Sequence, residues 1–261
     1  MNPALWIGKT GVDAQNTRLA VISNNLANIN TTGFKADRAI FQDLFYQNVR
    51  QPGAQANQVN TLPSGLQLGT GVQLVATQKL FTDGNYQNTG APLDVAINGR
   101  GFFQVLLPDG TLAYTRDGIF QLDENGQLLT SGGYTLEPGI QIPDNSQGIF
   151  ISRDGVVSVK LPNDPTPNQV GNIQLADFIN PSGLQPIGEN LFLETQSSGA
   201  PIIDDPANNG LGTLRQGMLE TSNVNAVEEL VNMIEAQRAY EMNTRAISTA
   251  DQMLQFMTTN L

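Results

Sequence analysis

The acidic pair Asp204 and Asp205 is the clearest place in this sequence where side chains could do chemistry. Glycoside hydrolysis needs two carboxylates at a defined separation, one as the acid and the other as nucleophile or base. Here, however, Pro206 follows directly in a stretch rich in Asn and Gly, where adjacent acids are usually solvated turn residues. A carboxylate-based hydrolase is kept as an alternative, and we expect no catalytic residues.

Two further motifs match ligand-binding loops only in part. The run Asp123-Glu124-Asn125-Gly126 begins like a calcium loop, but Tyr134 stands where the twelfth position needs a bidentate acid. The run Gly99-Arg100-Gly101 lacks the third glycine of a dinucleotide-binding turn, because Gln104 occupies that position. We expect a hairpin turn in the first case, and neither a metal site nor a cofactor site in this chain.

The composition removes most other enzyme chemistry. The 261 residues include no His and no Cys, so imidazole bases, thiolate nucleophiles, disulfides and zinc-thiolate sites are excluded. With 13 Lys and Arg against 24 Asp and Glu, the net charge is −11, which offers no basic surface to nucleic acid. Charged residues make up only 14% of the chain. A weakly charged polar surface of this kind favours packing between proteins, and we predict a non-enzymatic protein that does not bind nucleic acid.

Helical periodicity marks both ends of the chain. Near the N-terminus apolar residues recur every seven positions, and a second set follows three positions later. Near the C-terminus a stripe continues in steps of three and four, and Ser222 or Asn223 is the expected cap of this helix. The predicted assembly interface consists of these two stripes: Leu5, Val12, Leu19, Ile22, Leu26, Ile29, Met233, Ala236, Tyr240, Asn243, Ile247, Ala250, Leu254 and Met257.

Two ordinary surface helices on one core are the alternative to an assembly element. Both periodic segments, however, exceed the 11 to 12 residues of a typical globular helix. Small or polar residues at stripe positions, notably Ala236, Asn243 and Ala250, permit close helix approach. We expect the stripes to lack a partner and to be largely disordered until copies of the chain pack against them, which would couple folding of the ends to assembly.

Strand and turn patterns fill the middle of the chain, from about Ala91 to Gly217. Asp-Gly and Asn-Gly pairs between short apolar runs are typical of hairpins, because Asp and Asn tolerate positive φ. Their spacing predicts a compact meander in a sandwich-like or barrel-like domain. Hairpin turns are predicted at residues 108–110, 116–118, 124–126 and 153–155.

Residues 47–71 differ from both regions, since Gln, Asn, Gly and Pro dominate and Arg50 is the one charged residue. This composition is typical of a flexible linker. The alternating residues at 66–68 and 72–75 instead permit a long hairpin that pairs with another segment. A structureless loop of this length inside a compact domain would be unusual, so both interpretations are kept.

The sequence thus predicts an α+β fold with three parts. Residues 1–33 and 222–261 form discontinuous terminal α-helices in a coiled-coil-like inner domain. Residues 34–92 are a connecting segment with the long Gln/Asn/Gly-rich hairpin, and residues 93–221 form a mainly antiparallel β outer domain and the return to the C-terminal helix. Neither a membrane span nor a cleaved signal peptide is recognisable, and we expect no membrane insertion.

Motifs at both ends resemble the bacterial flagellar rod and hook family. The run from Ser23 to Lys35 is similar to its N-terminal signature. Residues 220–225, leading through 236–241 to 249–254, are similar to its C-terminal signature. The run from Val95 to Phe103 also resembles the family, so that the similarity covers essentially the whole chain.

This resemblance implies a structural subunit of the flagellar basal body that polymerises helically into a rigid hollow drive shaft and transmits torque from motor to hook. Chain length and residues 50–66 are similar to the distal rod branch of the family. A hook or proximal rod subunit and a secreted β-rich binding module are the alternatives.

The resemblance also implies partners and a location. The partners are further copies of the chain, proximal rod and hook subunits, the surrounding ring proteins that act as a bushing, and the flagellar export apparatus. Export without signal-peptide cleavage would bring the chain to a basal body that spans the periplasm.

Two segments receive more specific roles from the resemblance. Phe41 and Phe45 fit a loose Phe-x-x-x-apolar export signal of this secretion class, although an i, i+4 packing pair is an equal alternative. A second segment is expected to stiffen the rod by filling the space between outer domains. Its residues are Gln51, Pro52, Gly53, Leu62, Pro63, Ser64 and Gly65.

Overall fold

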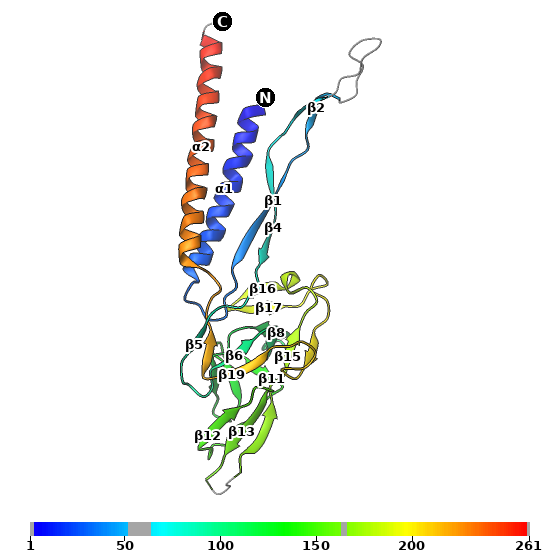
Figure 1. The fold of residues 1–261 in the computed structure, drawn as a ribbon, viewed down its shortest axis with the longest axis vertical. Helices are drawn as coiled ribbons and strands as arrows, with labels where there is room; N and C mark the ends of the chain where they lie inside the picture. Colours follow the sequence, from blue (N-terminus) through cyan, green and yellow to red (C-terminus); the bar gives the residue numbers. More distant parts are fainter. Residues whose placement is uncertain (1–2, 52–63, 163–165, 260–261) are drawn as a thin grey trace. The chain divides into compact units, whose positions relative to one another are not determined.

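The computed structural model of the chain describes residues 3–51, 64–162 and 166–259 (Figure 1). Contacts divide the chain into two compact units. Unit 1 comprises Met1–Ala27, Asp37–Gln78 and Asn225–Leu261. Unit 2 comprises Asn28–Ala36 and Lys79–Val224. Each unit is therefore assembled from segments that lie far apart in the sequence.

Unit 1 consists of a helix pair and a β-ribbon. Helices α1 (Pro3–Ala27) and α2 (Ala226–Thr259) lie side by side. In the ribbon, β1 pairs with β4 and β2 pairs with β3. The bounds of these strands are Asp37–Asp43 for β1, Gln47–Arg50 for β2, Leu66–Leu68 for β3 and Val72–Lys79 for β4.

The ribbon decides between the two interpretations of residues 47–71. In the described part of this segment the hairpin interpretation is confirmed, because β2 and β3 are antiparallel partners, with Asn48 opposite Gln67. The flexible-linker interpretation is wrong for these residues. Residues 52–63 lie outside the described residues.

The start of α2 differs from the expectation by two residues or more. Asn225 caps the helix, since its Oδ1 accepts a hydrogen bond from the amide of Val227 at 3.1 Å. Asn223, one of the two expected caps, instead bonds through its side chain to the amide of Ala36. Within the described residues, neither helix combines the length and the apolar character that crossing a membrane requires.

Unit 2 is built almost entirely of short strands. The largest sheet among the described residues has the order β16-β17-β8-β7-β11-β10-β9, and β15 joins it by pairing with β7 and with the edge strand β18. A three-stranded sheet has the order β12-β13-β14, and β6 pairs with β19 and β5 with β20. A one-turn 3₁₀ helix spans Pro181–Gly183. The strand bounds are β5 Tyr86–Asn88, β6 Val95–Asn98, β7 Phe102–Leu106, β8 Leu112–Thr115, β9 Phe120–Leu122, β10 Leu128–Thr130, β11 Thr135–Glu137, β12 Gly148–Ile151, β13 Val156–Lys160, β14 Asn168–Asn172, β15 Leu175–Asp177, β16 Gln185–Gly188, β17 Leu191–Leu193, β18 Ile202–Asp204, β19 Thr213–Gln216 and β20 Met218–Glu220.

Three of the four predicted hairpin turns are confirmed. The turns at 108–110, 124–126 and 153–155 join the antiparallel pairs β7 and β8, β9 and β10, and β12 and β13. The fourth prediction is wrong, because residues 116–118 join β8 to β9, which do not pair with each other. This connection passes close to another strand, since a Cβ on Gly118 would lie 1.7 Å from the carbonyl oxygen of Val95.

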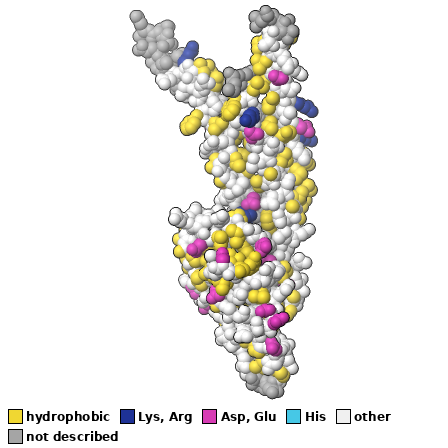
Figure 2. Space-filling model, turned by 180° about the vertical axis from the view of Figure 1, so that it is seen from behind, with side chains coloured by type: hydrophobic (Ala, Val, Ile, Leu, Met, Phe, Trp, Pro, Cys, Tyr) yellow, Lys and Arg dark blue, Asp and Glu magenta, His cyan; other side chains and the backbone are white. Residues whose placement is uncertain are grey.

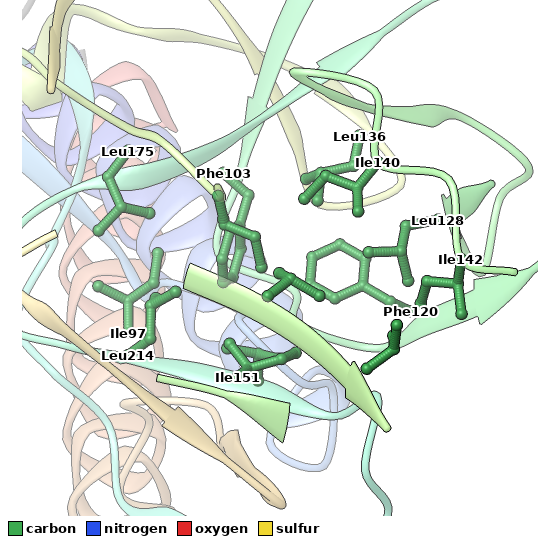
Figure 3. Packing of buried hydrophobic residues seen from close by; sticks show 14 of the residues in the cluster. Ile97, Phe103, Phe120, Leu128, Leu136, Ile140, Ile142, Ile151, Leu175 and Leu214 are labelled. Atoms are coloured by element: carbon green, nitrogen blue, oxygen red, sulfur yellow. The ribbon is translucent and has the colours of Figure 1, made fainter. Parts of the chain in front are cut away.

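The main core of unit 2 lies between these sheets. Phe103 and Phe120 meet edge to face, with ring centroids 5.1 Å apart. Aliphatic side chains from several strands surround them, as Figure 3 shows for Leu128, Leu136 and Ile140. Burial of these apolar side chains is the main stabilising contribution to the unit. The predicted α+β class, with helices from the termini and antiparallel strands between them, is confirmed.

Candidate assembly interface

The predicted stripe on α2 packs largely against α1 of the same chain. Ala236 and Ala250 are buried, whereas Met257 is exposed. On α1, Ile22 is buried, and Ile29 lies beyond the end of the helix in unit 2. The remaining stripe positions are half-buried: Leu5, Val12, Leu19, Leu26, Met233, Tyr240, Asn243, Ile247 and Leu254.

Two glycines on α1 set the close spacing of the helix pair. A Cβ on Gly8 would lie 2.6 Å from Cγ1 of Ile247, and one on Gly11 would lie 3.0 Å from Nδ2 of Asn243. The stripes therefore have a partner within one chain, and the expectation that they lack one before assembly is wrong. Gly8 and Gly11 were missed by the sequence analysis, although their spacing of three residues follows the helical period.

The buried amide of Asn25 joins three elements of unit 1. Its Nδ2 donates to the carbonyl of Asp37 at 2.9 Å and to Oε1 of Glu229 at 3.1 Å. Its Oδ1 accepts from the amide of Asp37 at 2.9 Å. Asn25 thus links α1 to the first residue of β1 and to the first turn of α2. The motif around it was recognised, but this role was not, because neither partner is near Asn25 in the sequence.

A second group of apolar side chains on α2 is left uncovered by the described residues of unit 1. Val227 is 70% exposed and Phe256 is 72% exposed, and about half of each side chain of Leu230, Val231 and Ile234 is exposed. At about 100° per residue, these positions fall roughly opposite the stripe that contacts α1. Hydrophobic side chains are visible along the helices in Figure 2. The exposed apolar side chains thus form a patch on the first turns of α2, with Phe256 near the end of the helix, whereas the same face carries Arg238, Glu241 and Arg245 in between.

Apolar side chains are exposed elsewhere in unit 1 as well. On α1, Trp6 and Ile7 are exposed, and Nζ of Lys9 lies 5.5 Å from the ring centroid of Trp6. The ribbon exposes Val49, Leu66, Leu68, Leu74 and Val75. Exposed apolar side chains mark a surface that binds another protein where they form a contiguous patch.

The predicted stiffening and export residues fall on or near this ribbon. Gln51 follows β2 directly, and Ser64 and Gly65 precede β3, whereas Pro52, Gly53, Leu62 and Pro63 lie outside the described residues. Phe41 lies on β1, and Phe45 follows it with 94% of its surface exposed. The packing-pair interpretation of Phe41 and Phe45 is therefore wrong, since it requires a helix and a buried contact.

Asp204 and Asp205, the acidic pair considered above for glycoside hydrolysis, accept hydrogen bonds that hold a loop together. Asp205 Oδ1 accepts from Nδ2 of Asn172 at 2.6 Å, and Oδ1 of Asp204 accepts from the Asp205 amide at 2.8 Å. The other oxygen of Asp204 accepts a hydrogen bond from Asn209. Within the described ranges, no three acidic side chains gather in a way that could hold a metal ion. The run at Asp123 is the predicted hairpin turn, closed by a bond from the Gly126 amide to the Asp123 carbonyl at 2.9 Å.

Comparison with known proteins places these features in a family. Three family models match: the flagella basal body rod protein model over residues 6–35, the flagellar hook protein FlgE/F/G D1 domain over residues 96–159, and the flagellar basal body rod FlgEFG protein C-terminal model over residues 215–261. The matches cover most of α1, part of the β-rich middle and the whole of α2.

Whole-length relatives agree with the three models. The flagellar basal-body rod protein FlgG of Buchnera aphidicola subsp. Acyrthosiphon pisum is 58% identical over 98% of both chains. That of Borreliella burgdorferi is 49% identical over 97% of both, and that of Bacillus subtilis is 38% identical over 97% of this chain and 96% of the relative. The chain belongs to the FlgG-like flagellar basal-body rod proteins.

Proposed function

We propose that this structural subunit of the distal flagellar rod polymerises helically with copies of itself into a rigid hollow shaft that carries torque from motor to hook. The observation that supports the proposal best is the exposed apolar patch on the first turns of α2, formed by Val227, Leu230, Val231 and Ile234. A cluster of exposed apolar side chains on one side of a helix is typical of a surface that binds another protein. Within the chain, α1 covers the opposite side of α2, and a neighbouring copy would cover this patch.

Repetition of one such contact is sufficient to build a shaft. When two identical subunits contact each other through different surfaces, the same contact can be repeated by every further copy. The copies form a closed ring if the rotation between neighbours returns to the first subunit, and an open helical assembly if it does not. The predicted stripe residues then act inside each subunit, by holding α1 and α2 at a fixed spacing. The exposed residues Val227, Leu230, Val231, Ile234 and Phe256 would form the contact between copies.

The substitution Ile234→Asp tests this contact. Ile234 is half-exposed in one chain, so a carboxylate there is tolerated by the monomer but would be buried without a partner in the assembly. Electron microscopy of concentrated protein is expected to show shafts for the natural chain and none for the variant, with equal helix content in dilute solution. Ile179→Asp, on an exposed residue of unit 2, is the matched control and should assemble. Shafts formed by the Ile234→Asp protein would overturn the proposal.

The β-ribbon supports a role in stiffness. Its exposed apolar side chains Val49, Leu66 and Leu68 flank the segment predicted to fill the space between neighbouring subunits. Contacts there would prevent the sliding that lets a shaft bend. Deletion of residues 53–65 is expected to give a curved or flexible shaft by electron microscopy, and a straight rigid one would contradict this role.

Membership of the basal-body rod family supports wider contacts at the ends and the outside of the shaft. In this proposal the shaft spans the periplasm, meets proximal rod and hook subunits at its two ends, and turns inside ring proteins that act as a bushing. The chain reaches this position through the flagellar export apparatus without cleavage of a signal peptide, and it has no catalytic role.

Phe45 is exposed, so replacing it should not disturb the fold, and the proposed export signal can be tested by substitution. If Phe41 and Phe45 are recognised during export, Phe41→Ala and Phe45→Ala should both reduce secretion while the purified proteins unfold at the same denaturant concentration as the natural chain. Normal secretion of both variants would exclude the signal.

A further inference from the structure

A buried cluster of charges lies in unit 2, where the segment that follows α1 meets the segment that precedes α2. Nζ of Lys35 lies 2.7 Å from Oε1 of Glu220, and Nη1 of Arg116 lies 3.5 Å from Oε2 of the same carboxylate. The side chains of Lys35 and Glu220 are each only 1% exposed, and that of Arg116 is 3% exposed. One buried carboxylate therefore compensates two buried cations.

Neutral groups and one further carboxylate complete the surroundings of these charges. Nζ of Lys35 also donates to the carbonyl of Thr82 at 2.8 Å, and the amide of Gly84 donates to Oε1 of Glu220 at 2.9 Å. The guanidinium of Arg116 lies 5.2 Å from the ring centroid of Phe102. Asp83 is 3.8 Å from Arg116 and partly exposed. Burial lowers the pKa of Lys35, and the negative charge of Glu220 opposes this effect.

Backbone contacts join the same segments. The amide of Gly33 donates to the carbonyl of Glu220 at 2.9 Å. The amide of Ala36 donates to Oδ1 of Asn223 at 2.7 Å, and Nδ2 of Asn223 donates to the carbonyl of Leu80 at 2.8 Å. Residues 33–36, 80–84 and 220–223 are thus held to one another by charges and by hydrogen bonds.

Stability alone does not account for such a cluster. Replacing a buried ion pair by apolar residues of similar volume is often neutral or stabilising, whereas removing one partner strands a buried charge. A cluster of this kind is favourable only when all its members are in place, which makes it all-or-none. Since Lys35 and Glu220 are 185 residues apart in the sequence, closing the cluster carries the entropy cost of bringing two distant segments together.

We propose that Lys35, Arg116, Glu220 and Asn223 form a junction latch, a conformational device that orders residues 33–36 only when the return segment 220–223 is docked. The largest sheet of unit 2 folds first, and its strand β8 leads directly to Arg116. The latch then closes and opens as one local step at the end of β20, without unfolding of the largest sheet. Because the two latched segments lead to α1 and to α2, both connections to the helices become ordered together.

The substitution Glu220→Gln in the full chain tests the latch, because it keeps the shape of the side chain and removes the charge that Lys35 and Arg116 share. Hydrogen exchange is measured at the amides of Gly33 and Ala36 and compared with Val105 and Ala113, which face each other on β7 and β8. Exchange at Gly33 and Ala36 is expected to rise about a hundredfold or more, the effect of stranding a buried charge, with no change at Val105 and Ala113.

Asp177→Asn is the matched control. It makes the same carboxylate-to-amide change in unit 2, but the partner of Asp177, Arg100, is 64% exposed and lies 2.9 Å away. This control should leave exchange at Gly33 and Ala36 unchanged. A second variant, Asn223→Ala, removes the amide link to Ala36 without altering charge, and it should open the same two sites by a smaller factor.

Two results would overturn the latch. Unchanged exchange at Gly33 and Ala36 in Glu220→Gln would show that these charges do not order the segment. A rise there accompanied by an equal rise at Val105 and Ala113 would show that the cluster opens only with the whole unit. If the Glu220→Gln protein does not fold, Asn223→Ala decides the question by the same two comparisons.

Discussion

At the scale of single residues, Asn25 shows how one amide can fix several elements. Both its donor and its acceptor bond to the backbone of Asp37, and the donor also reaches Glu229. These groups are buried or partly buried, so a lost partner is not replaced fully by water. The residue therefore fixes where the chain enters the ribbon relative to α1.

Replacing Asn25 with Ala should lower the free energy of unfolding by about 1 to 3 kcal/mol, the range for leaving buried backbone groups unpaired. Denaturant unfolding followed by circular dichroism measures the change. Asn16→Ala, at an exposed position of the same helix, is the control and should change stability by less than about 0.5 kcal/mol. Equal effects of the two substitutions would mean that the bonds of Asn25 contribute nothing.

Tyr114 gives a prediction for alkaline solution. Burial, assisted by the negative charge of Glu194, raises the pKa of Tyr114 from 10.0 to about 12. A group with a raised folded-state pKa contributes stability that is complete below pH 10 and is lost as pH rises to about 12. The loss corresponds to about 2 to 3 kcal/mol.

The Tyr114→Phe protein has no phenol at this position and should lose less stability over the same interval. Urea unfolding at a series of pH values gives the difference between the two proteins. Lys35 changes stability in the opposite direction, because burial lowers its pKa. Both proteins contain Lys35, so its effect cancels in the difference between them. Parallel declines in the two proteins would rule out ionisation of Tyr114 as a cause.

At the scale of elements, the spacing of α1 and α2 depends on glycine at the contact. Glycine weakens a helix by about 1 kcal/mol relative to alanine, so Gly8→Ala would stabilise an isolated helix. In the pair, the added Cβ would lie 2.6 Å from Ile247, closer than packed atoms approach. Helix propensity and the contact with Ile247 therefore change the free energy of unfolding in opposite directions when Gly8 is replaced by alanine.

We expect the contact to dominate, so that Gly8→Ala lowers the free energy of unfolding of the natural chain. In an Ile247→Ala background, which removes the opposing side chain, the same substitution should raise it. A double-mutant cycle measures this change of sign. Stabilisation by Gly8→Ala in both backgrounds would show that the helices do not approach closely at this point.

At the scale of the whole molecule, charge is unevenly divided between the units. The sequence of unit 2 contains 16 Asp and Glu and 7 Lys and Arg, a net charge of −9, which leaves −2 for unit 1. On the face that Figure 2 shows, acidic side chains are scattered over the surface of unit 2. Neighbouring copies in a shaft would repel one another mainly through this unit.

Salt should therefore promote self-assembly, because the Debye length falls to about 10 Å at 0.1 M ionic strength. Sedimentation of the protein over a range of salt concentrations is expected to show a lower concentration for the onset of assembly at higher salt. The double variant Glu124→Gln/Asp144→Asn, at two exposed acidic positions of unit 2, should assemble at lower salt than the natural chain. Weaker assembly at high salt would indicate that attraction between charges drives it instead.

Much of the element structure followed from local patterns. The periodicity of the two ends, the Asp-Gly turns at 108–110 and 153–155 and the α+β class were predicted correctly, since each depends on residues close together in the sequence. The turn at 116–118 was not, because this connection joins strands that do not pair and packs against Val95, which is distant in the sequence. The cap of α2 was misplaced for a similar reason, since Asn223 bonds to Ala36.

The sequence by itself determined which residues lie on each helix face, where the chain turns and which chemistry the absence of His and Cys excludes. Only the tertiary structure decided what each face and each charge meets. The stripe on α2 contacts α1, its opposite face remains exposed, and Lys35 finds Glu220 across 185 residues. Periodicity states that a face will be buried without naming its partner, because the partner is chosen by long-range packing of the folded chain.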